Sequence, residues 1–518
     1  MYPFRTLKKC SNLGMIFLIA VFSFGVVHSQ TIQPISQISI YGKSADAQCG
    51  YSVSDAGDFN DDGFTDVIIG ARLATSDGIN KTGEAYIIFG SMSYSEVIDL
   101  NNLAGSGIVV TGSNSDDQLG FCVSKAGDIN GDNIDDILIS ATNAEIAGKL
   151  NTGCVYIIYG SINPPSVINV SSLQSAGIVV CGKNTDDALG FSISDIGDFN
   201  DDGFDDVIIG AQCYSGNGEY HAGEAYIILG DSDLPSEIDL SDVNSHIITI
   251  RLNQQNAMLG YDVSSAGDIN NDGFDDVIVS ANSFSVSERN YCGRCFIIYG
   301  SVNPSSEIDL EGTGSNYFSV TGKYSYDCLG TKISNAGDVN NDSYDDILLA
   351  TMYNYSNEVY ILFGRNEPFS DIDLEYANPF IKTIKIDYDD MEQYSVIGVS
   401  DANDINKDGF GDIMISLPSL SYEGFVKNGD VFILNGSDSL SETINLSNYN
   451  KLEIKNYSNG SFFGSSISAV ADFNKDGFAD IIVGAYKVDY DGKTDCGEVR
   501  IFLLGYDAFA NVPYEIYR

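Results

Sequence analysis

Seven short acidic segments share the pattern D-x-N-x-D-[GNS]-x-x-D, and the first of them runs from Asp58 to Asp66. Positions 1, 3, 5 and 9 each carry a side-chain oxygen, and position 6 is usually glycine, which suits a tight turn with positive φ. Carboxylate and amide oxygens in one short loop favour a hard cation, and calcium fits better than magnesium, which prefers to keep its waters. The sequence therefore predicts one Ca²⁺ in each loop, up to seven in all.

A polar β-turn and an EF-hand both fit these loops less well than a repeated calcium site. A polar β-turn would account for a single copy, but not for seven copies in register. An EF-hand would need glutamate at position 12, where the first loop has Ile69. Asn133 and Ser343 replace the glycine of the second and fifth loops. Serine tolerates positive φ less well than asparagine, so the fifth loop should bind metal more weakly.

The loops begin 70, 70, 70, 70, 66 and 68 residues apart, so the elements that position them belong to a repeated unit. Each repeat has four short segments rich in β-branched and aromatic residues, without a helical period. In the first repeat these are GYSVSDAG before the loop, then DVIIGA, EAYIIFG and GIVVTG after it. Seven repeats of four antiparallel strands predict an all-β, seven-bladed β-propeller. A parallel β-helix has much shorter coils, and β-sandwiches need about 100 residues each.

The last repeat lacks a fourth segment, because no equivalent of GIVVTG follows VRIFLLG before Arg518. ISQISIYG, residues 35–42, stands before the first repeat in the position of a fourth strand. We therefore expect this N-terminal strand to pair with residues 499–504 as the outer strand of the last blade. Such closure protects the ring from opening at an edge and fixes the number of blades.

The segments LGF (Leu119–Phe121), IIGA (Ile68–Ala71) and FG (Phe89–Gly90) flank these loops and resemble the FG-GAP repeats of the integrin alpha-chain head propeller. The resemblance covers residues 30–518 and implies a calcium ion in the loop between the first two strands of each blade. It also implies a role in cell adhesion or extracellular protein recognition. Carried over residue by residue, the implied metal ligands are Asp58, Asn60, Asp62, Asp66, Asp128, Asn130, Asp132, Asp136, Asp198, Asn200, Asp202, Asp206, Asp268, Asn270, Asp272, Asp276, Asp338, Asn340, Asp342, Asp346, Asp404, Asn406, Asp408, Asp412, Asp472, Asn474, Asp476 and Asp480.

Several features set the chain apart from an integrin subunit. The 70-residue spacing leaves no room for an inserted adhesion domain, and no D-x-S-x-S motif occurs. No leg domains, membrane span or cytoplasmic tail are expected after the propeller. These differences argue against an integrin beta chain as partner, and the expected partner is an extracellular protein or a glycan.

Residues 1–29 are typical of a signal peptide, because three basic residues precede the apolar run 13–27 and Ser29 suits cleavage before Gln30. The remaining residues, 30–518, are predicted to form one secreted propeller without a membrane span. Several Asn-x-Ser/Thr sites fit a secreted glycoprotein. A net charge of −47 argues against nucleic acid or an anionic membrane as partner.

The predicted ligand face lies opposite the metal loops. Antiparallel strands alternate in direction, so the variable connections between strands two and three must lie at the other end of each blade. Tyrosine and arginine, which are frequent in binding hot spots, gather there in the fourth and fifth repeats. The chain contains 31 tyrosines, so simple abundance could also account for this gathering. The candidates are Phe284, Arg289, Tyr291, Tyr324, Tyr326, Tyr353 and Tyr355.

No catalytic motif is found, because the chain has no G-x-S-x-G or H-E-x-x-H, and only His221 and His246 follow residue 29. The chain is therefore predicted not to be an enzyme. Its lack of tryptophan excludes sialidase-type Asp boxes and a Trp-based sugar platform. Two alternatives remain open on the same propeller, a carbohydrate-binding lectin and a carbohydrate-active enzyme that uses paired carboxylates.

The chain has ten cysteines, of which one lies in the predicted leader, and pairing is the default in an exported protein. The phase of the repeats places some of them at neighbouring strand ends. A local Cys292–Cys295 bridge is the alternative, although it would close almost no loop. The predicted bridges are Cys49–Cys496 and Cys292–Cys328, with Cys154–Cys181 as a third candidate.

Overall fold

The computed structural model describes residues 36–505, apart from 77, 147, 216–218, 242–244, 313–315, 353–356, 367–368, 389–395, 422–423 and 457. The predicted leader, residues 1–29, and two ligand-face candidates, Tyr353 and Tyr355, lie outside the described residues. Within the described part of the chain, no helix is long and apolar enough to cross a membrane.

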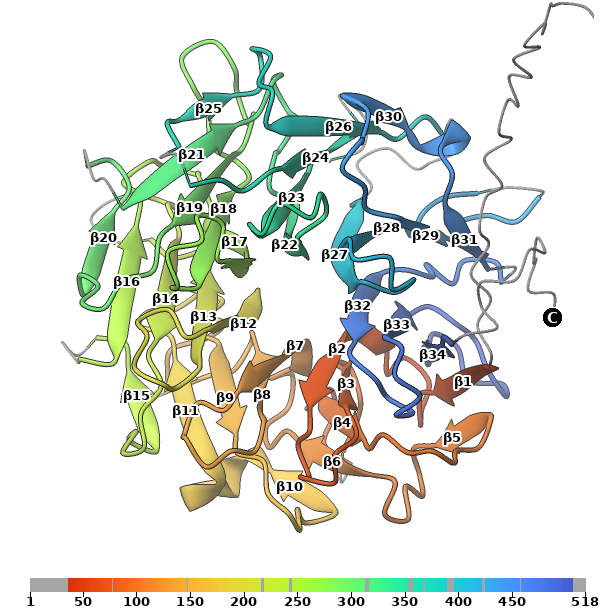
Figure 1. The fold of residues 1–518 in the computed structure, drawn as a ribbon. Helices are drawn as coiled ribbons and strands as arrows, with labels where there is room; N and C mark the ends of the chain where they lie inside the picture. Colours follow the sequence, from red (N-terminus) through yellow and green to blue (C-terminus); the bar gives the residue numbers. More distant parts are fainter. Residues whose placement is uncertain are drawn as a thin grey trace, which may run out of the picture.

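Seven sheets stand around a central axis like the blades of a propeller, as Figure 1 shows. The predicted seven-bladed, all-β architecture is thus confirmed. Each blade runs outward from an innermost strand, through a second and a third strand, to an outer strand. The innermost strands are β2(Cys49–Gly57), β7(Leu119–Gly127), β12(Ile193–Gly197), β17(Leu259–Gly267), β22(Lys332–Gly337), β27(Gly398–Asn403) and β32(Ser466–Val470).

The other three strands of each blade follow in chain order around the ring. The second strands are β3(Asp66–Ala71), β8(Asp136–Ala141), β13(Asp206–Ala211), β18(Asp276–Ala281), β23(Asp346–Ala350), β28(Asp412–Leu417) and β33(Asp480–Ala485). The third strands are β4(Glu84–Ile88), β9(Cys154–Ile158), β14(Glu224–Ile228), β19(Arg294–Ile298), β24(Glu358–Leu362), β29(Asp430–Leu434) and β34(Glu498–Leu503). The outer strands are β6(Gly107–Thr111), β11(Gly177–Cys181), β16(Ile247–Arg251), β21(Tyr317–Thr321), β26(Ile381–Lys385), β31(Leu452–Lys455) and, in the seventh blade, β1(Ser36–Tyr41).

The ring closes as the sequence predicts. Strand β1 pairs antiparallel with β34 over six register positions, from Ser36 opposite Leu503 to Tyr41 opposite Glu498. The two ends of the described chain therefore meet in one sheet, and the last blade has no missing strand. Closure matters because an open blade would leave a row of unpaired backbone groups exposed.

The prediction of four antiparallel strands per blade is incomplete, because six of the seven sheets have a fifth, short strand. In the first repeat this strand is β5(Val97–Asp99), which pairs parallel with β1 of the neighbouring blade. Each such strand covers the outer edge of the preceding blade and ties the two blades together. The others are β10(Val167–Asn169), β15(Glu237–Asp239), β20(Glu307–Asp309), β25(Ile372–Asp373) and β30(Thr443–Asn445). Three 3-10 turns complete the described structure: η1(Val170–Ser172), η2(Gln174–Ala176) and η3(Leu446–Asn448).

The hydrophobic core lies between neighbouring blades. Every residue of β3 and of β4 is buried, which explains why these strands read as continuous apolar runs instead of alternating ones. Ile68 and Ile87 of the first blade pack in one cluster with Ile137 and Ile139 of the second. Each blade is thus covered on both faces, and the metal loops are attached to rigid, buried strands.

One of the three predicted disulfides is present. Cys154 and Cys181 are directly opposed in register on β9 and β11, with their Cα atoms 4.2 Å apart, and are joined by a bond. The predicted Cys49–Cys496 and Cys292–Cys328 bridges are absent, and all four residues are thiols. In each pair the backbones are close, since Cys49 N donates to Cys496 O at 3.0 Å. The pairs are not opposed across an antiparallel ladder, however, and Cys496 Sγ instead donates to Val488 O at 3.4 Å.

Candidate metal centres and ligand face

Each acidic loop follows an innermost strand and ends at the first residue of the second strand, so the fold presents all seven loops at one end of the ring. Position 6 adopts positive φ, at 83° for Gly63, 67° for Asn133 and 71° for Ser343. This is the left-handed conformation that the sequence predicts for the turn. Asn133 and Ser343 therefore occupy the same geometry as glycine, at a larger conformational cost for the serine.

The aspartate at position 1 organises each loop. Asp58 Oδ1 accepts a hydrogen bond from Asp62 N at 2.9 Å, and its Oδ2 accepts one from Gly63 N at 2.7 Å. The same pair of bonds forms in the other six loops. At position 3, Asn60 Oδ1 accepts from Asp62 N at 3.0 Å. These bonds fold the loop so that its side-chain oxygens lie on a compact turn.

The aspartate at position 9 is fully buried in all seven loops. Asp66 Oδ1 accepts a hydrogen bond from Gly90 N at 2.9 Å, which ties the start of β3 to the end of the third strand. Asp66 Oδ2 and Asp276 Oδ2 are buried and have no hydrogen-bond partner, whereas the same oxygen in the other five loops accepts from the backbone N–H of position 2. Burial is the main cause that raises the pKa of Asp66 to about 8, with smaller contributions from the neighbouring charges of Asp62 and Asp58. The equivalent groups behave alike, with pKa values of about 7 to 8.

A buried carboxylate oxygen without a partner is costly, and a bound cation is one way to satisfy it. The donors of these loops are all oxygen, which fits calcium by chemistry. Among the described residues, no three His, Cys, Asp or Glu side chains already converge as a metal cluster. The fit therefore rests on the loop as a whole, including the asparagine at position 3, and not on a preformed cage of carboxylates.

The predicted ligand-face residues divide into two groups. Phe284 is only 8% exposed, so it belongs to the core and not to a binding surface. Arg289 is engaged by Asp373 in a forked ion pair and donates to Gly322 O at 2.7 Å. Phe284 therefore packs in the core and Arg289 is held within its own blade, because the connection between β18 and β19 folds back onto that blade. Tyr291, Tyr324 and Tyr326 are exposed, at 42%, 49% and 45%.

A second aromatic group was not predicted from the sequence. Tyr51, Phe121, Phe191 and Tyr261 occupy the same position in four consecutive repeats, and successive ring centroids lie 5.4, 5.4 and 5.3 Å apart. We call these four residues the aromatic arc. They stand near the starts of innermost strands, so the arc borders the central channel at the end away from the metal loops. The sequence signal that could have revealed the arc is an aromatic residue directly after a glycine, repeated every 70 residues.

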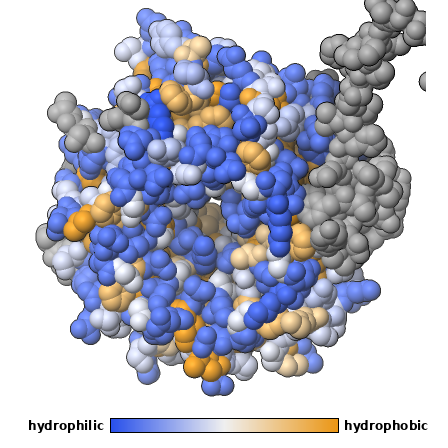
Figure 2. All heavy atoms as spheres, in the orientation of Figure 1, coloured by the Kyte–Doolittle hydropathy of each residue, from blue (hydrophilic) through white to orange (hydrophobic). Residues whose placement is uncertain are grey.

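Charged groups surround the arc and the channel below it. The Arg72 guanidinium lies 3.8 Å from the ring centroid of Tyr51, and its Nε donates to Gln48 Oε1 at 2.8 Å. Farther along the innermost strands, Lys125 Nζ lies 3.3 Å from Asp195 Oδ2, and Asp195 is the main cause that raises the pKa of Lys125. In Figure 2 the ring is hollowed at its centre, and mostly hydrophilic residues surround the opening.

Comparisons with known proteins agree with this architecture. The FG-GAP repeat model matches residues 50–88, 192–228, 259–293 and 463–502. The chain is 28% identical over 411 residues to phosphatidylinositol-glycan-specific phospholipase D of Dictyostelium discoideum, which covers 75% of this chain and 41% of that protein. It is 31% identical over 147 residues to integrin alpha pat-2 of Caenorhabditis elegans, covering 28% of this chain and 11% of the integrin. Integrin alpha-6 of Gallus gallus is 28% identical over 177 residues, covering 33% and 14%.

The predicted resemblance is thus confirmed: the chain is a seven-bladed propeller in which FG-GAP repeats are matched in four places, and it is similar to integrin alpha chains and to a phospholipase D. It spans less than half the length of that phospholipase and less than a sixth of either integrin.

Proposed function

We propose that this chain is a secreted recognition protein that binds calcium in its seven acidic loops and a protein ligand on the opposite face, in a role related to adhesion. The observation that supports this most directly is the division of the ring into two ends. One end repeats an ordered acidic loop seven times. The other end gathers the aromatic arc, Arg72 and exposed tyrosines, which are the residue types that dominate binding hot spots.

Calcium would be held by the loop oxygens at positions 1, 3, 5 and 9, for example by Asp58, Asn60, Asp62 and Asp66. The ion would supply positive charge beside carboxylates whose burial is otherwise costly. The chain itself prepares the loop, because position 1 is held by two backbone amides and position 9 by the end of the third strand. Calcium in this place would be structural, since it would join the first two strands of a blade.

The arc is suited to an anchor from a partner protein. Its four rings are partly buried, so they are already held in place and lose little side-chain entropy on binding. Tyr51 is packed between Phe121, Tyr486 and Arg72, which fixes its orientation. Rigid aromatic side chains around a concave channel are typical of the centre of a protein interface.

The test uses the secreted, calcium-loaded chain, immobilised and exposed to the extracellular medium of its own source. Bound proteins are identified and their affinities are then measured singly, in calcium and in excess EGTA. The double variant Tyr51→Ala/Phe121→Ala should weaken binding by about tenfold or more. The control Tyr376→Ala removes a tyrosine that is 70% exposed and lies outside the arc, and it should bind normally. Equal affinity of both variants, or undiminished binding in EGTA, would contradict the proposal.

A second candidate function follows from a similarity that covers 75% of this chain and is to an enzyme that its name describes as specific for phosphatidylinositol-glycan. The same propeller could therefore recognise, or act on, a glycan. Incubating the purified chain with a phosphatidylinositol-glycan-anchored protein and measuring release of that protein tests activity directly. Release that persists in the Tyr51→Ala/Phe121→Ala variant would separate this function from recognition by the arc.

A further inference from the structure

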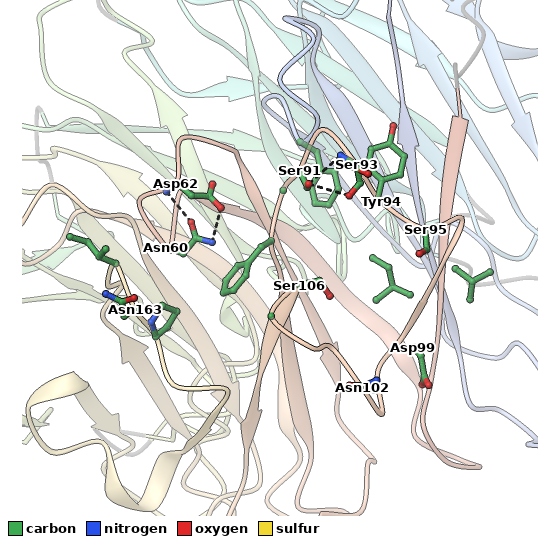
Figure 3. A pocket seen from close by; sticks show the side chains of 18 residues that line it. Asn60, Asp62, Ser91, Ser93, Tyr94, Ser95, Asp99, Asn102, Ser106 and Asn163 are labelled. Carbon is green, nitrogen blue, oxygen red and sulfur yellow. Dashed lines mark hydrogen bonds between the residues drawn. The ribbon is translucent and has the colours of Figure 1, made fainter.

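A groove with a volume of about 850 Å³ lies on the metal-loop side of the first blade. Figure 3 shows its polar side chains around a common space. Asn60 and Asp62 of the first metal loop line one part of it, and the connection from β4 to β6 supplies most of the rest. The connection from β9 to β10 adds Asn163, and Phe473 of the seventh metal loop closes the inner side.

The walls of this groove are fixed by the backbone. Ser91 N donates to Phe473 O at 3.0 Å, which holds the connection of the first blade against the seventh loop. Ser161 N donates to Phe59 O, also at 3.0 Å, which holds the next connection against the first loop. Tyr94 is partly buried, and its hydroxyl lies 3.3 Å from Ser36 Oγ. The groove is therefore part of the rigid ring and exists before any ligand arrives.

The lining has a definite chemical character. Ten of its eighteen residues have polar side chains, and these ten are the residues labelled in Figure 3. None of the eighteen is lysine, arginine or histidine, so the lining itself offers no cationic side chain to an anionic ligand. Hydroxyl and amide groups both donate and accept hydrogen bonds, as sugar hydroxyls do. The rings of Tyr94 and Phe89 supply an apolar surface for a ligand that has both polar and apolar faces.

The second blade provides an internal comparison. The equivalent groove there has a volume of about 350 Å³. In it Pro164 stands in the place of Tyr94, and Ala176 in the place of Ser106. The crevice between a metal loop and the next connection is thus a feature of the repeat, but the first blade enlarges it and adds polar and aromatic groups. The groove of the first blade is thus larger than its counterpart and has Tyr94 and Ser106 where the second blade has proline and alanine.

A peptide is a poorer match for this groove. Extended peptides commonly bind by adding a strand to an exposed sheet edge. The outer strand β6 is already paired with β10, from Val109 opposite Val167 to Thr111 opposite Asn169. The neighbouring outer strand β1 is likewise covered by β5. Neither of these strands therefore offers a main-chain ladder, and the sheet edge that lines the groove is β5, which has only three residues, Val97–Asp99.

We infer that the groove of the first blade binds a neutral oligosaccharide, with Asp99, Asn102 and Asn163 as hydrogen-bonding residues and Tyr94 as the stacking surface. This site lies at the opposite end of the ring from the aromatic arc, so it is additional to the proposed recognition function and independent of it. Asp99 is exposed, and its Oδ1 accepts from Asn101 N at 2.9 Å and from Asn101 Nδ2 at 2.8 Å.

The test compares two double variants related by the repeat. Asp99→Asn/Asn163→Ala changes the groove of the first blade. Asp239→Asn/Asn303→Ala changes the same two positions two blades farther on, where Asp239 Oδ1 likewise accepts from a backbone amide, Ser241 N, at 2.8 Å. The two double variants should therefore change the free energy of unfolding by similar amounts. Binding is measured in saturating calcium on an array of neutral, sialylated and sulfated oligosaccharides, with titration of each hit.

We expect the unmodified chain to bind at least one neutral oligosaccharide, the groove variant to lose about tenfold or more in affinity, and the control variant to bind normally. Failure to bind any neutral oligosaccharide would overturn the inference, as would preferred binding of sialylated or sulfated glycans. Equal losses in both variants would also overturn it, because the effect would then not belong to the groove. Protein binding at the aromatic arc is measured in a separate experiment with Tyr51→Ala/Phe121→Ala. Failure of the oligosaccharide inference therefore leaves the proposed protein recognition testable, and the reverse also holds.

Discussion

Strand β1 closes the ring, and its pairing with neighbouring strands holds it in place. Strand β1 is tethered to the described chain at one end, through β2, and pairs with β34 and β5. Ile40 pairs with Val499 of β34 and with Ile98 of β5, is fully buried and packs with Ile38 and Ile501. Replacing Ile40 by alanine removes buried methyl and methylene groups without changing the backbone.

Truncation of a buried isoleucine to alanine costs about 2–5 kcal/mol. Since release of β1 breaks only the contacts of β1, local opening should become more frequent by roughly 30- to 5,000-fold. The control is Ile250→Ala, at the same repeat position in β16, where the side chain is also fully buried. Strand β16 is tethered on both sides, to β14 and β17, so its loss of packing should act on global stability without opening the ring.

The assay is native-state hydrogen exchange on peptides that contain residues 498–503. We expect fast exchange there in Ile40→Ala and slow exchange in Ile250→Ala, although both variants lower the melting temperature by a similar amount. The exposed edge of β34 should also make Ile40→Ala associate as its concentration rises. If residues 498–503 stay protected in Ile40→Ala, or if residues 224–228 exchange as fast in the control, β1 is not the weak point of the ring.

Three further predictions concern the loops and one buried acid. Chelation by excess EGTA should lower the melting temperature, because an ion bound only to the folded state stabilises it by about 2.7 kcal/mol per site at 100 times its Kd; an unchanged melting curve would count against calcium. Ser343→Gly should raise the free energy of unfolding by about 0.5–1 kcal/mol, since glycine adopts the φ of 71° without strain, whereas Gly63→Ser should lower it. Burial raises the pKa of Asp187 to about 6, so its ionisation opposes folding, and stability should fall as the pH rises from about 4 through 6. Asp187→Asn should lack this loss and be up to about 3 kcal/mol more stable at pH 8, as urea titrations at pH 4 and pH 8 can measure.

Much of the fold could be predicted because the sequence repeats its local signals. The run DVIIGA is apolar throughout, as a strand covered on both faces must be, and it becomes β3 with every residue buried. The strand that closes the ring could be located by counting, since the last repeat was one strand short. The fifth strands were missed because β5 has three residues, too few for a periodic pattern, and its pairing depends on a neighbouring blade.

The site was predicted less completely. The loops are continuous in sequence, so their residues could be named, and the structure brings each set together on one turn. The burial of Phe284 and the pairing of Arg289 with Asp373 could not be predicted, because composition does not show that a connection folds back onto its own blade. The aromatic arc was overlooked because Tyr51 and its equivalents are 70 residues apart and meet only when the ring is closed. Two cysteines can be joined when they lie directly opposite each other on neighbouring antiparallel strands. The spacing of the repeats predicts such positions only approximately, and only Cys154 and Cys181 of the three predicted pairs are opposed in this way.

The seven repeats also allow two kinds of position to be compared within one chain. The first residue of the third strand is buried or nearly so in each blade, yet it is Glu84, Cys154, Glu224, Arg294, Glu358, Asp430 or Glu498. Blade two uses a disulfide there, blade one an ion pair with Lys43, and blade seven an ion pair with Arg500. Several chemistries thus stabilise the same point of the fold.

The metal loops behave differently, because positions 1, 3, 5 and 9 keep the same residues in all seven copies. A turn alone would not require this, since serine, threonine and asparagine also cap turns. Seven identical sets of four oxygen-bearing side chains are what one shared ligand in every loop would require, although positions 1, 3 and 9 also accept backbone hydrogen bonds that fold the loop. This reasoning supports calcium as that ligand, and it also predicts that Asn60→Asp, which keeps the oxygen, should preserve metal affinity better than Asn60→Ala, as calorimetric titration with Ca²⁺ would measure.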